Sequence, residues 1–328
     1  MNRLVLIDGN AVLHRAYHAL PPLTAPDGSI VNAVYGFASI LFKLHHDLAP
    51  THLAVAFDRP KPTFRKKLFA DYQAKRPEMD KELVGQIEKV HELIRAFGIP
   101  IYEMDGYEAD DVIGTLCRNV QRGKSKAQSG TINQVIIVTG DRDILQLVED
   151  EKVFVYMPTK GLSEAKLYGE KEVVERIGVK PSQIVEFKAL AGDASDNYPG
   201  VSGIGPKTAI TLVEAFGSID HLYKALKTKD ARVKKVSDAI VEKLKTGEES
   251  ARMSHDLATI RTDVPIEATI EDARVGTIDT PQARKILEDL HFHSLLKRLT
   301  GNAEEKKPTK KEKKEEQELL NSEQQQLL

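Results

Sequence analysis

The sequence is poor in cysteine and contains no long hydrophobic run. A single cysteine, Cys117, stands among 328 residues, which excludes an internal disulfide and suits a reducing compartment. No apolar stretch reaches about 18 residues, and the first strand-like run, residues 4–7, is too short for a signal peptide or a membrane span. We therefore expect a soluble, cytoplasmic protein.

The chain also lacks a strong excess of charge of either sign. It has 47 basic and 49 acidic residues, which gives a formal net charge of −2. Many of the acids are concentrated in a few short motifs. If metal ions neutralised those motifs, the rest of the chain would be clearly positive, so the near-neutral total is compatible with binding a polyanion.

Short apolar runs alternate with helical patterns through the first half of the chain. The helical patterns cover residues 30–48 and 80–97, where apolar residues recur near a 3.6-residue period. This alternation predicts an α/β fold with a mostly parallel sheet flanked by helices. The expected strands are residues 4–7, 52–57, 99–102, 134–138 and, as the last one, 153–156.

The character of the sequence changes near residue 175. Residues 1–175 are expected to form the α/β domain, with a flexible surface loop at 123–130. Residues 176–300 read as helices and tight turns, which predicts a separate all-α subdomain. Residues 301–328 are rich in lysine and glutamate and have no aromatic residue, which predicts a disordered tail.

Aspartates follow three of the expected strands. Asp8, Asp58 and the pair Asp141 and Asp143 each come just after an apolar run. One such aspartate is commonly a turn former or helix cap. Their repetition instead points to the carboxyl edge of a parallel sheet, where α/β proteins bind ligands.

Two further motifs add carboxylates. Glu108, Asp110 and Asp111 stand at the expected start of a helix, where acids also interact favourably with the helix dipole. Because Glu108 and Asp110 would not face each other within a helix, Glu108 should lie at or just before its start. Asp193 and Asp196 are expected to lie on one helical face, as i, i+3 neighbours.

These acids have the chemistry of a magnesium or manganese site. No histidine or cysteine accompanies them at ligand spacing, which argues against zinc, whereas all-oxygen ligation suits Mg²⁺ or Mn²⁺. Mg²⁺ is usually held by few carboxylates, so the number of acids predicts two or more ions, which together can hydrolyse a phosphodiester. The predicted ligands are Asp8, Asp58, Glu108, Asp110, Asp111, Asp141, Asp143, Asp193 and Asp196.

Two other stretches fit a polyanion. Residues 59–76 hold seven basic residues and one acid, with aromatic residues interleaved. Closely spaced glycines at 200–205 precede a helix that is expected to begin at Pro206, which leaves backbone N–H groups free for a phosphate. Lys207 adds a charge beside them. The alternative reading of this second stretch is an ordinary turn between helices.

Together these motifs resemble the 5′-nuclease (flap endonuclease) family, most closely the 5′→3′ exonuclease domain of bacterial DNA polymerase I. The resemblance covers about residues 1–300. It rests on the motifs Asp8-Gly9-Asn10, Phe57-Asp58, Gly106 to Asp111, Thr139 to Leu147, Gly192 to Asn197, Gly200 to Ala209 and Phe292 to Leu299.

The resemblance implies a PIN-like nuclease core, a helical arch at residues 59–97 and a helix-hairpin-helix turn at 199–209 that can hold K⁺. It implies cleavage of DNA 5′ ends and 5′ flaps by two metal ions, in RNA-primer removal and DNA repair. Asp8, Asp58, Glu108, Asp110 and Asp111 would hold one ion, and the other four acids the second. Arg15, Arg65 and Arg76 would contact phosphates as catalytic residues. The implied DNA-binding residues are Lys66, Lys67, Tyr72, Lys75, Gly203, Gly205, Lys207 and Thr208.

Two positions depart from the family pattern. Gln73 stands where a lysine is expected directly after the arch tyrosine, and a missing cation there would weaken stabilisation of the transition state. We therefore expect reduced activity. Tyr198 stands where the pattern has an aliphatic residue, and the sequence alone gives it no function.

Other functions and partners stay open on the sequence. A DNA-binding module without catalysis and a PIN-type ribonuclease are the alternatives, and RNA–DNA hybrids are possible substrates. The chain could be a free-standing nuclease or part of a longer polymerase. We expect a monomer, and the Gln/Leu end of the tail could dock into a sliding clamp or a polymerase.

Overall fold

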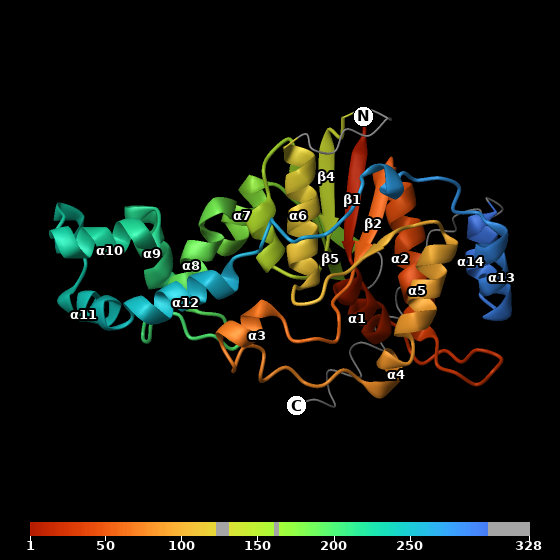
Figure 1. Cartoon of the computed structure of the whole chain (residues 1–328), viewed down its shortest axis with the longest axis horizontal. Helices are drawn as coiled ribbons and strands as arrows, with labels where there is room; N and C mark the ends of the chain where they lie inside the picture. Colours follow the sequence, from red (N-terminus) through yellow and green to blue (C-terminus); the bar gives the residue numbers. More distant parts are fainter. Residues whose placement is uncertain (123–130, 161–163, 301–328) are drawn as a thin grey trace, which may run out of the picture.

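The computed structural model describes residues 1–122, 131–160 and 164–300. Its centre is a six-stranded sheet with the order β3-β2-β1-β4-β5-β6. The first five strands in that order run parallel, and β6 pairs antiparallel with β5 (Figure 1). The strands are β1 (Arg3–Asp8), β2 (His52–Ala56), β3 (Ile101–Tyr102), β4 (Gln134–Val138), β5 (Val153–Lys160) and β6 (Glu164–Tyr168).

Both faces of the sheet are buried. Successive residues of a strand point to opposite faces, so Leu4 and Leu6 belong to one core while Val5 and Ile7 belong to the other. Helix α6 (Ala109–Gln121) covers the first face, with α7 (Glu170–Ile177) farther along it. The second face is covered by α1 (Gly9–Ala19), α2 (Asn32–Leu48) and α5 (Ile87–Ala96) (Figure 1).

A lobe of helices extends from one side of the α/β domain (Figure 1). It consists of α8 (Ile184–Ala191), α9 (Pro206–Phe216), α10 (Ile219–Thr228), α11 (Asp238–Thr246) and α12 (Glu248–Ala258). Between β2 and α5 the chain crosses beneath the sheet as α3 (Phe64–Leu68), a series of turns and α4 (Lys81–Val84).

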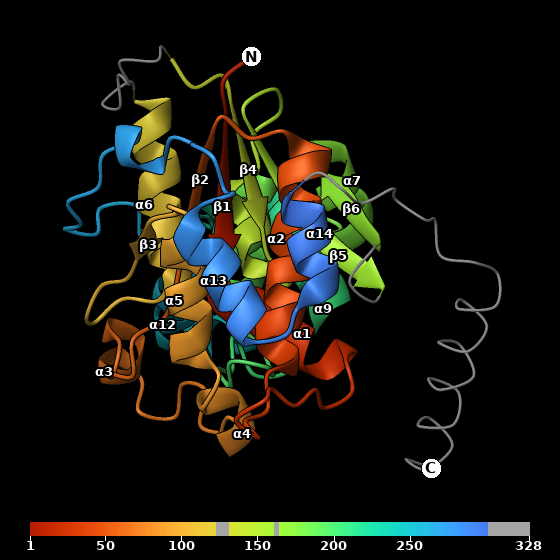
Figure 2. The same ribbon diagram turned by 90° about the vertical axis from the view of Figure 1, so that its right-hand side faces the viewer.

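The end of the described chain returns to the α/β domain. After α12 it runs back past α6 and forms α13 (Pro281–Asp289) and α14 (His293–Leu299), which lie beside α2 and α5 (Figure 2). Leu287 and Leu295 are fully buried in the core that these helices share. The segment expected as one helical subdomain, 176–300, is therefore divided between the lobe and the nuclease-like core.

The mostly parallel sheet is confirmed, and the differences from the expected elements are local. Strand β6 follows the strand that was expected to be the last. The helix expected at 80–97 is interrupted near Gly85, so α4 and α5 are separate, and the arch region holds only short helices. The expected flexible loop at 123–130 and tail at 301–328 lie outside the described residues. None of the helices in the described part of the chain is long and apolar enough to cross a membrane.

Candidate active site

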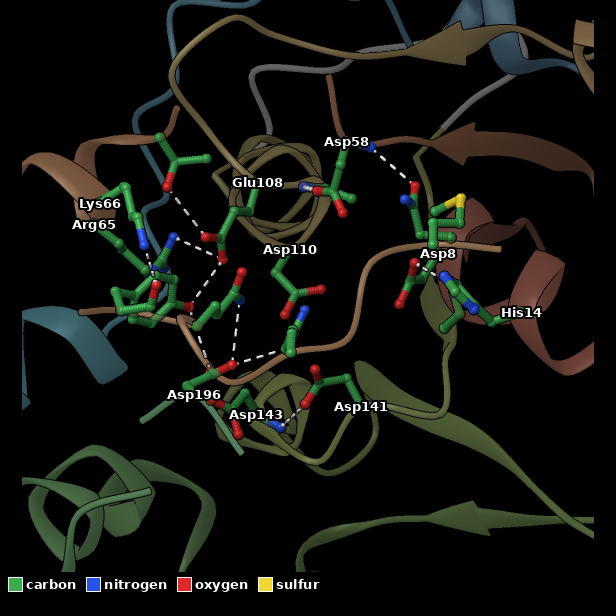
Figure 3. Close-up of a pocket in the computed structure, with 18 of the residues that line it drawn as sticks. Asp8, His14, Asp58, Arg65, Lys66, Glu108, Asp110, Asp141, Asp143 and Asp196 are labelled. Atoms are coloured by element: carbon green, nitrogen blue, oxygen red, sulfur yellow. Dashed lines mark hydrogen bonds and ion pairs between the residues drawn. The ribbon is translucent and has the colours of Figure 1, made fainter. Parts of the chain in front are cut away.

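Three neighbouring parallel strands bring aspartates to one edge of the sheet. Strand β1 lies between β2 and β4, and Asp8, Asp58 and Asp141 lie at or just beyond their carboxyl ends. Asp8 caps helix α1, since its Oδ1 accepts the N–H of Ala11 at 3.0 Å and its Oδ2 accepts the hydroxyl of Thr139 at 2.6 Å. Figure 3 shows the three carboxylates around one cavity, as the spacing predicted.

The start of α6 forms the next wall of this cavity. Glu108 is the N-cap of the helix, as expected, and Asp110 lies in the first turn. The N–H of Ala109 donates to Oδ1 of Asp58 at 2.7 Å, which ties this helix start to the end of β2. The Asp110 carboxylate occupies the middle of the group in Figure 3, with Asp141 beside it.

The third acid of that motif, Asp111, has a different environment. Asp111 is fully buried and accepts two hydrogen bonds from Arg65, at 2.7 and 2.8 Å, and one from the N–H of Arg261 at 2.8 Å. Arg65 is only 3% exposed and also donates to the carbonyl of Leu257 at 2.8 Å. These contacts support neither the predicted ligand role of Asp111 nor the predicted phosphate contact of Arg65. They instead join α3, α6 and the end of α12.

A second group of acids lies at the junction with the helical lobe. Asp143, Asp193 and Asp196 each offer a carboxylate oxygen, and these oxygens lie within 4.8 Å of one another. The ammonium of Lys188 on α8 forms ion pairs with Asp143 and, at 2.5 Å, with Asp193. Three acids this close require a compensating cation, and in this structure Lys188 supplies part of that charge.

A tight hairpin, not a helix, positions two of these acids. Asp193 and Tyr198 form an isolated antiparallel bridge, with reciprocal backbone hydrogen bonds of 2.9 and 3.0 Å, around a turn at 194–197. A Cβ at Gly200 would lie 2.3 Å from the backbone nitrogen of Gly192, so only glycine permits this approach. The expected placement of Asp193 and Asp196 on one helical face is therefore wrong, although the two remain close.

Residues of the arch region contact Asp196. Arg76 donates to its Oδ1 at 2.8 Å, and the side chain of Gln73 donates to the same oxygen at 3.2 Å. The backbone N–H of Gln73 donates to the backbone carbonyl of Asp196 at 2.8 Å. The Tyr72 hydroxyl lies 3.3 Å from carboxylate oxygens of both Glu108 and Asp196. Tyr72 is buried against Tyr198, so in this structure its ring is not available to unpaired bases.

The remaining arch cations lie nearer the solvent. Lys66 lines the cavity and donates to the carbonyl of Tyr72 at 2.9 Å, whereas Lys67 and Lys75 are exposed. Arg15 is half-buried on α1 and does not line the cavity, but its neighbour His14 does. The cavity has a volume of about 1000 Å³, and seven of the predicted ligands line it and are labelled in Figure 3: Asp8, Asp58, Glu108, Asp110, Asp141, Asp143 and Asp196.

The glycine turn follows the hairpin of Asp193 and Asp196 and leads into α9 in the helical lobe (Figure 1). Gly205 is the N-cap and Pro206 the first residue of the helix, as predicted. Gly203, Gly205 and Lys207 are exposed, whereas Thr208 is half-buried. The first backbone N–H groups of α9 therefore stand at the protein surface.

The charge balance of the cavity fits divalent cations. Burial raises the pKa of Asp8 and of Glu108 to about 7, and that of Asp143 also to about 7. Burial, followed by the charges of Asp141 and Asp8, raises the pKa of Asp110 well above its usual range. No hydrogen bond from the described residues reaches the Asp110 carboxylate. Buried, mutually repelling carboxylates of this kind are stabilised by a metal ion.

Several contacting residues had no signal in the sequence. Lys188 is one lysine in an ordinary helical pattern, and only the fold brings it to Asp143 and Asp193. Thr139, two residues before Asp141, is the exception, because its place in that motif was a usable signal for its contact with Asp8. The contact between Tyr198 and Tyr72 joins segments far apart in the chain and could not be read from spacing.

Two family models together match most of the described chain. Residues 3–178 match the 5′-3′ exonuclease N-terminal resolvase-like domain, and residues 179–281 match the 5′-3′ exonuclease C-terminal SAM fold. DNA polymerase I of Bacillus subtilis is 40% identical over 303 residues, covering 92% of this chain and 33% of the polymerase. DNA polymerase I of Chloroflexus aurantiacus is 41% identical over 304 residues, covering 90% and 30%. The chain thus spans about a third of the length of these relatives.

Solved structures share the fold. The T5 5′-exonuclease with bound zinc ions superposes with a TM-score of 0.62 at 18% identity, covering 92% of this chain and 98% of that one. The catalytic core of Rad2 in complex with DNA superposes with a TM-score of 0.56 at 16% identity, covering 91% of each chain. The parallel sheet, the acids at its carboxyl edge and the matches to both domain models lead to one conclusion: this chain belongs to the 5′-3′ exonuclease family.

Proposed function

We propose that this chain is a divalent-metal-dependent 5′→3′ exodeoxyribonuclease and 5′-flap endonuclease that hydrolyses DNA phosphodiesters. One observation carries the proposal: carboxylates from three strand ends, a helix start and a hairpin converge on one cavity with too few cations to balance them. A binding surface for a polyanion has no use for so many acids unless metal ions neutralise them.

The proposed ligands form two groups. Asp8, Asp58, Glu108, Asp110 and Asp141 would hold one Mg²⁺ or Mn²⁺, and Asp143, Asp193 and Asp196 the other, with Asp141 near both. Such a pair of ions lowers the pKa of an attacking water and stabilises the leaving oxygen. We assign Asp111 to the buried pair with Arg65 rather than to the metal site.

Cations of the chain itself would act on the substrate and on the site. Arg76 is half-exposed beside the cavity, so its guanidinium can exchange its bond to Asp196 for a scissile phosphate. Lys66 lines the same cavity, and Lys67 and Lys75 extend the positive surface toward the displaced strand. Lys188 holds Asp143 and Asp193 in place when no metal is bound. Arg15 is also a proposed phosphate contact. For Arg15 to reach a phosphate, α1 or the DNA would have to move.

The glycine turn supplies a second contact for duplex DNA. The free N–H groups at the start of α9, with Gly203, Gly205, Lys207 and Thr208, would hold backbone phosphates, and a K⁺ could join carbonyls to a phosphate there. We propose that the protein acts as a monomer in the bacterial cytosol on 5′ ends, flaps and RNA–DNA hybrids. A contact of residues 301–328 with a sliding clamp or a polymerase belongs to the same proposal.

Cleavage of a 5′-labelled flap tests the function. We expect Mg²⁺-dependent release of short flaps, loss of cleavage in EDTA, and a loss of at least a hundredfold in Asp141→Ala and Glu108→Gln. Glu92→Gln, an exposed acid on the outside of α5, is the matched control and should cut normally. Tight flap binding with no metal-dependent cleavage would support the non-catalytic alternative. Faster cleavage of RNA flaps than of DNA flaps would support a ribonuclease.

A further inference from the structure

Asn10 is a polar residue of the acidic cavity to which the proposed chemistry gives no role. It belongs to the motif Asp8-Gly9-Asn10 and stands in the first turn of α1. Its half-buried side chain lines the cavity together with Asp8 and Asp58. An amide can donate hydrogen bonds, which ionised carboxylates cannot do. Asn10 therefore brings a donor to a part of the cavity that is rich in acceptors.

The end of β2 fixes the orientation of the Asn10 amide. Its Oδ1 accepts the backbone N–H of Asp58 at 3.0 Å. Because a backbone N–H can only donate, the amide oxygen must face Asp58 and the amide NH₂ group must face away from that N–H. The NH₂ group makes no hydrogen bond with any described residue. Both of its N–H bonds are thus available to a ligand in the cavity.

The start of α1 holds Asn10 in place. Gly9 lies against the ring of Phe57, and a Cβ at Gly9 would stand 2.5 Å from atoms of that ring. Asp8 caps the same helix through the N–H of Ala11, at 3.0 Å. These contacts tie the first turn of α1 to the ends of β1 and β2. A donor held this firmly can be aimed at a reacting group.

The cations of the cavity lie on its other side. Figure 3 shows Arg65 and Lys66 across the cavity from Asp8 and His14. Burial lowers the pKa of His14, so its ring carries little charge at pH 7. A phosphate that lies among the acids would meet cations on the side of Lys66. On the side of Asp8 it would meet the neutral amide of Asn10.

We infer that Asn10 is a catalytic residue whose NH₂ group donates a hydrogen bond to a non-bridging oxygen of the phosphodiester that is cut. The negative charge of these oxygens must be stabilised in the transition state, and the loss of one fixed donor typically lowers a rate by about 10²–10³. This inference rests on the proposed function, because it requires a phosphodiester in the cavity.

Two substitutions separate the donor of the amide from its acceptor. Asn10→Asp keeps an oxygen for the N–H of Asp58 and lacks the NH₂ group, whereas Asn10→Ala lacks both. We expect each variant to lower the single-turnover rate of flap cleavage at least tenfold. Asn10→Ala should bind Mn²⁺ like the wild type in calorimetry. Asn119→Ala, which removes a half-buried asparagine near the other end of α6, is the matched control and should cut normally.

Sulfur substitution in the substrate tests the contact itself. Flaps that carry sulfur in place of either non-bridging oxygen of the scissile phosphate are cut by the wild type and by Asn10→Ala. Sulfur is a poor hydrogen-bond acceptor, so one of the two diastereomers should slow the variant less than it slows the wild type, by about threefold or more. Should Asn10→Ala fold poorly, Asn10→Asp must show the same difference.

The remaining outcomes count against the inference. If Asn10→Asp cuts like the wild type while Asn10→Ala does not, the amide serves only to hold Asp58. Equal sulfur effects in the variant and the wild type, or a loss of Mn²⁺ affinity in Asn10→Ala that accounts for its lower rate, also overturn the inference. In each of these cases the metal-dependent cleavage by the wild type leaves the proposed function standing. If the wild type cuts no flap with Mg²⁺, the proposed function itself fails.

Discussion

At the scale of single residues, the site is defined by carboxylates that are costly to ionise. Asp8 is buried, Glu108 and Asp143 are half-buried, and this burial raises the pKa of each to about 7. Adjacent acids nevertheless have different roles. Asp110 faces the other acids of the cavity and receives no hydrogen bond from a described residue, whereas Asp111 is enclosed by Arg65 and the N–H of Arg261. Two adjacent residues thus have different roles: Asp110 is a proposed metal ligand, and Asp111 belongs to a structural ion pair.

These pKa values predict how stability depends on pH in the metal-free protein. Each raised pKa favours the protonated form in the folded state, so this stabilisation is complete below pH 4 and is lost as pH rises through about 7. The free energy of unfolding then falls by about 1.4 kcal/mol per pH unit for each proton that is released on unfolding. In urea unfolding with EDTA, the free energy of unfolding should fall between pH 5 and pH 8, and saturating Mn²⁺ should remove the fall. A free energy that rises over this range without metal would contradict the assignment.

The two adjacent acids should respond oppositely to substitution. Asp110→Asn removes an uncompensated buried charge, so the metal-free protein should melt at a higher temperature while Mn²⁺ affinity is lost. Asp111→Asn removes the buried carboxylate that Arg65 contacts through two hydrogen bonds and leaves it only the ion pair with Glu108, at 3.2 Å. Breaking a buried pair costs about 3–5 kcal/mol. Thermal melts with and without Mn²⁺ measure both effects. Equal loss of metal binding with unchanged metal-free stability in the two variants would refute this division.

Gln73 gives a prediction about charge in the cavity. Its amide already donates to Asp196, so the lysine that we expected here from the resemblance would also stand beside this acid. Gln73→Lys should raise the single-turnover rate of flap cleavage several-fold, because the added cation stabilises charge in the transition state. Gln73→Met, which keeps the length and removes the donor, is the control and should not gain. No gain in Gln73→Lys would count against the role of a cation here.

At the scale of elements, the hairpin at 192–200 and the short helix α3 connect the core to the lobe. The hairpin presents Asp193 and Asp196 to the end of β4, and its closure depends on the contact between Gly192 and Gly200. Helix α3 is held by Arg65, which reaches α6 and the end of α12. The second metal site that we propose therefore requires the lobe to be docked on the core.

Because the hairpin depends on the close contact between Gly192 and Gly200, a single methyl group added at Gly200 should disrupt it. Gly200→Ala places a Cβ 2.3 Å from the nitrogen of Gly192, so the hairpin must open. We expect the variant to lose the Mn²⁺ bound by Asp143, Asp193 and Asp196 and to keep the other, as measured by calorimetry. Gly276→Ala, where a Cβ would meet nothing within 4 Å, is the control. Retention of both ions in Gly200→Ala would show that the hairpin does not position these acids.

At the scale of the whole molecule, the parallel sheet and its acidic edge could be predicted, because both are indicated by short local patterns of residues in the sequence. Apolar runs that end in aspartate fix Asp8, Asp58 and Asp141 at one edge, and parallel strands bring those ends together. The return of α13 and α14 to the core, the hairpin and the burial of Arg65 could not be predicted. They depend on contacts between distant segments, such as Tyr35 and Ser294, which are 259 positions apart, and periodicity does not encode these.

The proposed DNA contacts are the acidic cavity at the carboxyl edge of the sheet and the start of α9 in the helical lobe (Figure 1). Lys207→Ala should weaken binding to duplex DNA. It should also reduce the slope of log affinity against log salt concentration by about one, since one phosphate contact is lost. The single-turnover rate at saturating substrate should be nearly unchanged. Fluorescence anisotropy over a range of KCl concentrations measures the slope, and an unchanged slope would argue against a phosphate at this turn.

The central claim is that the acidic cavity holds two divalent cations. Anomalous diffraction from crystals grown with Mn²⁺ tests it most directly. We expect two peaks about 4 Å apart, one next to Asp110 and one among Asp143, Asp193 and Asp196, with the Arg65–Asp111 pair intact. No anomalous peak in the cavity, or a peak coordinated by Asp111 with Arg65 displaced, would contradict the account.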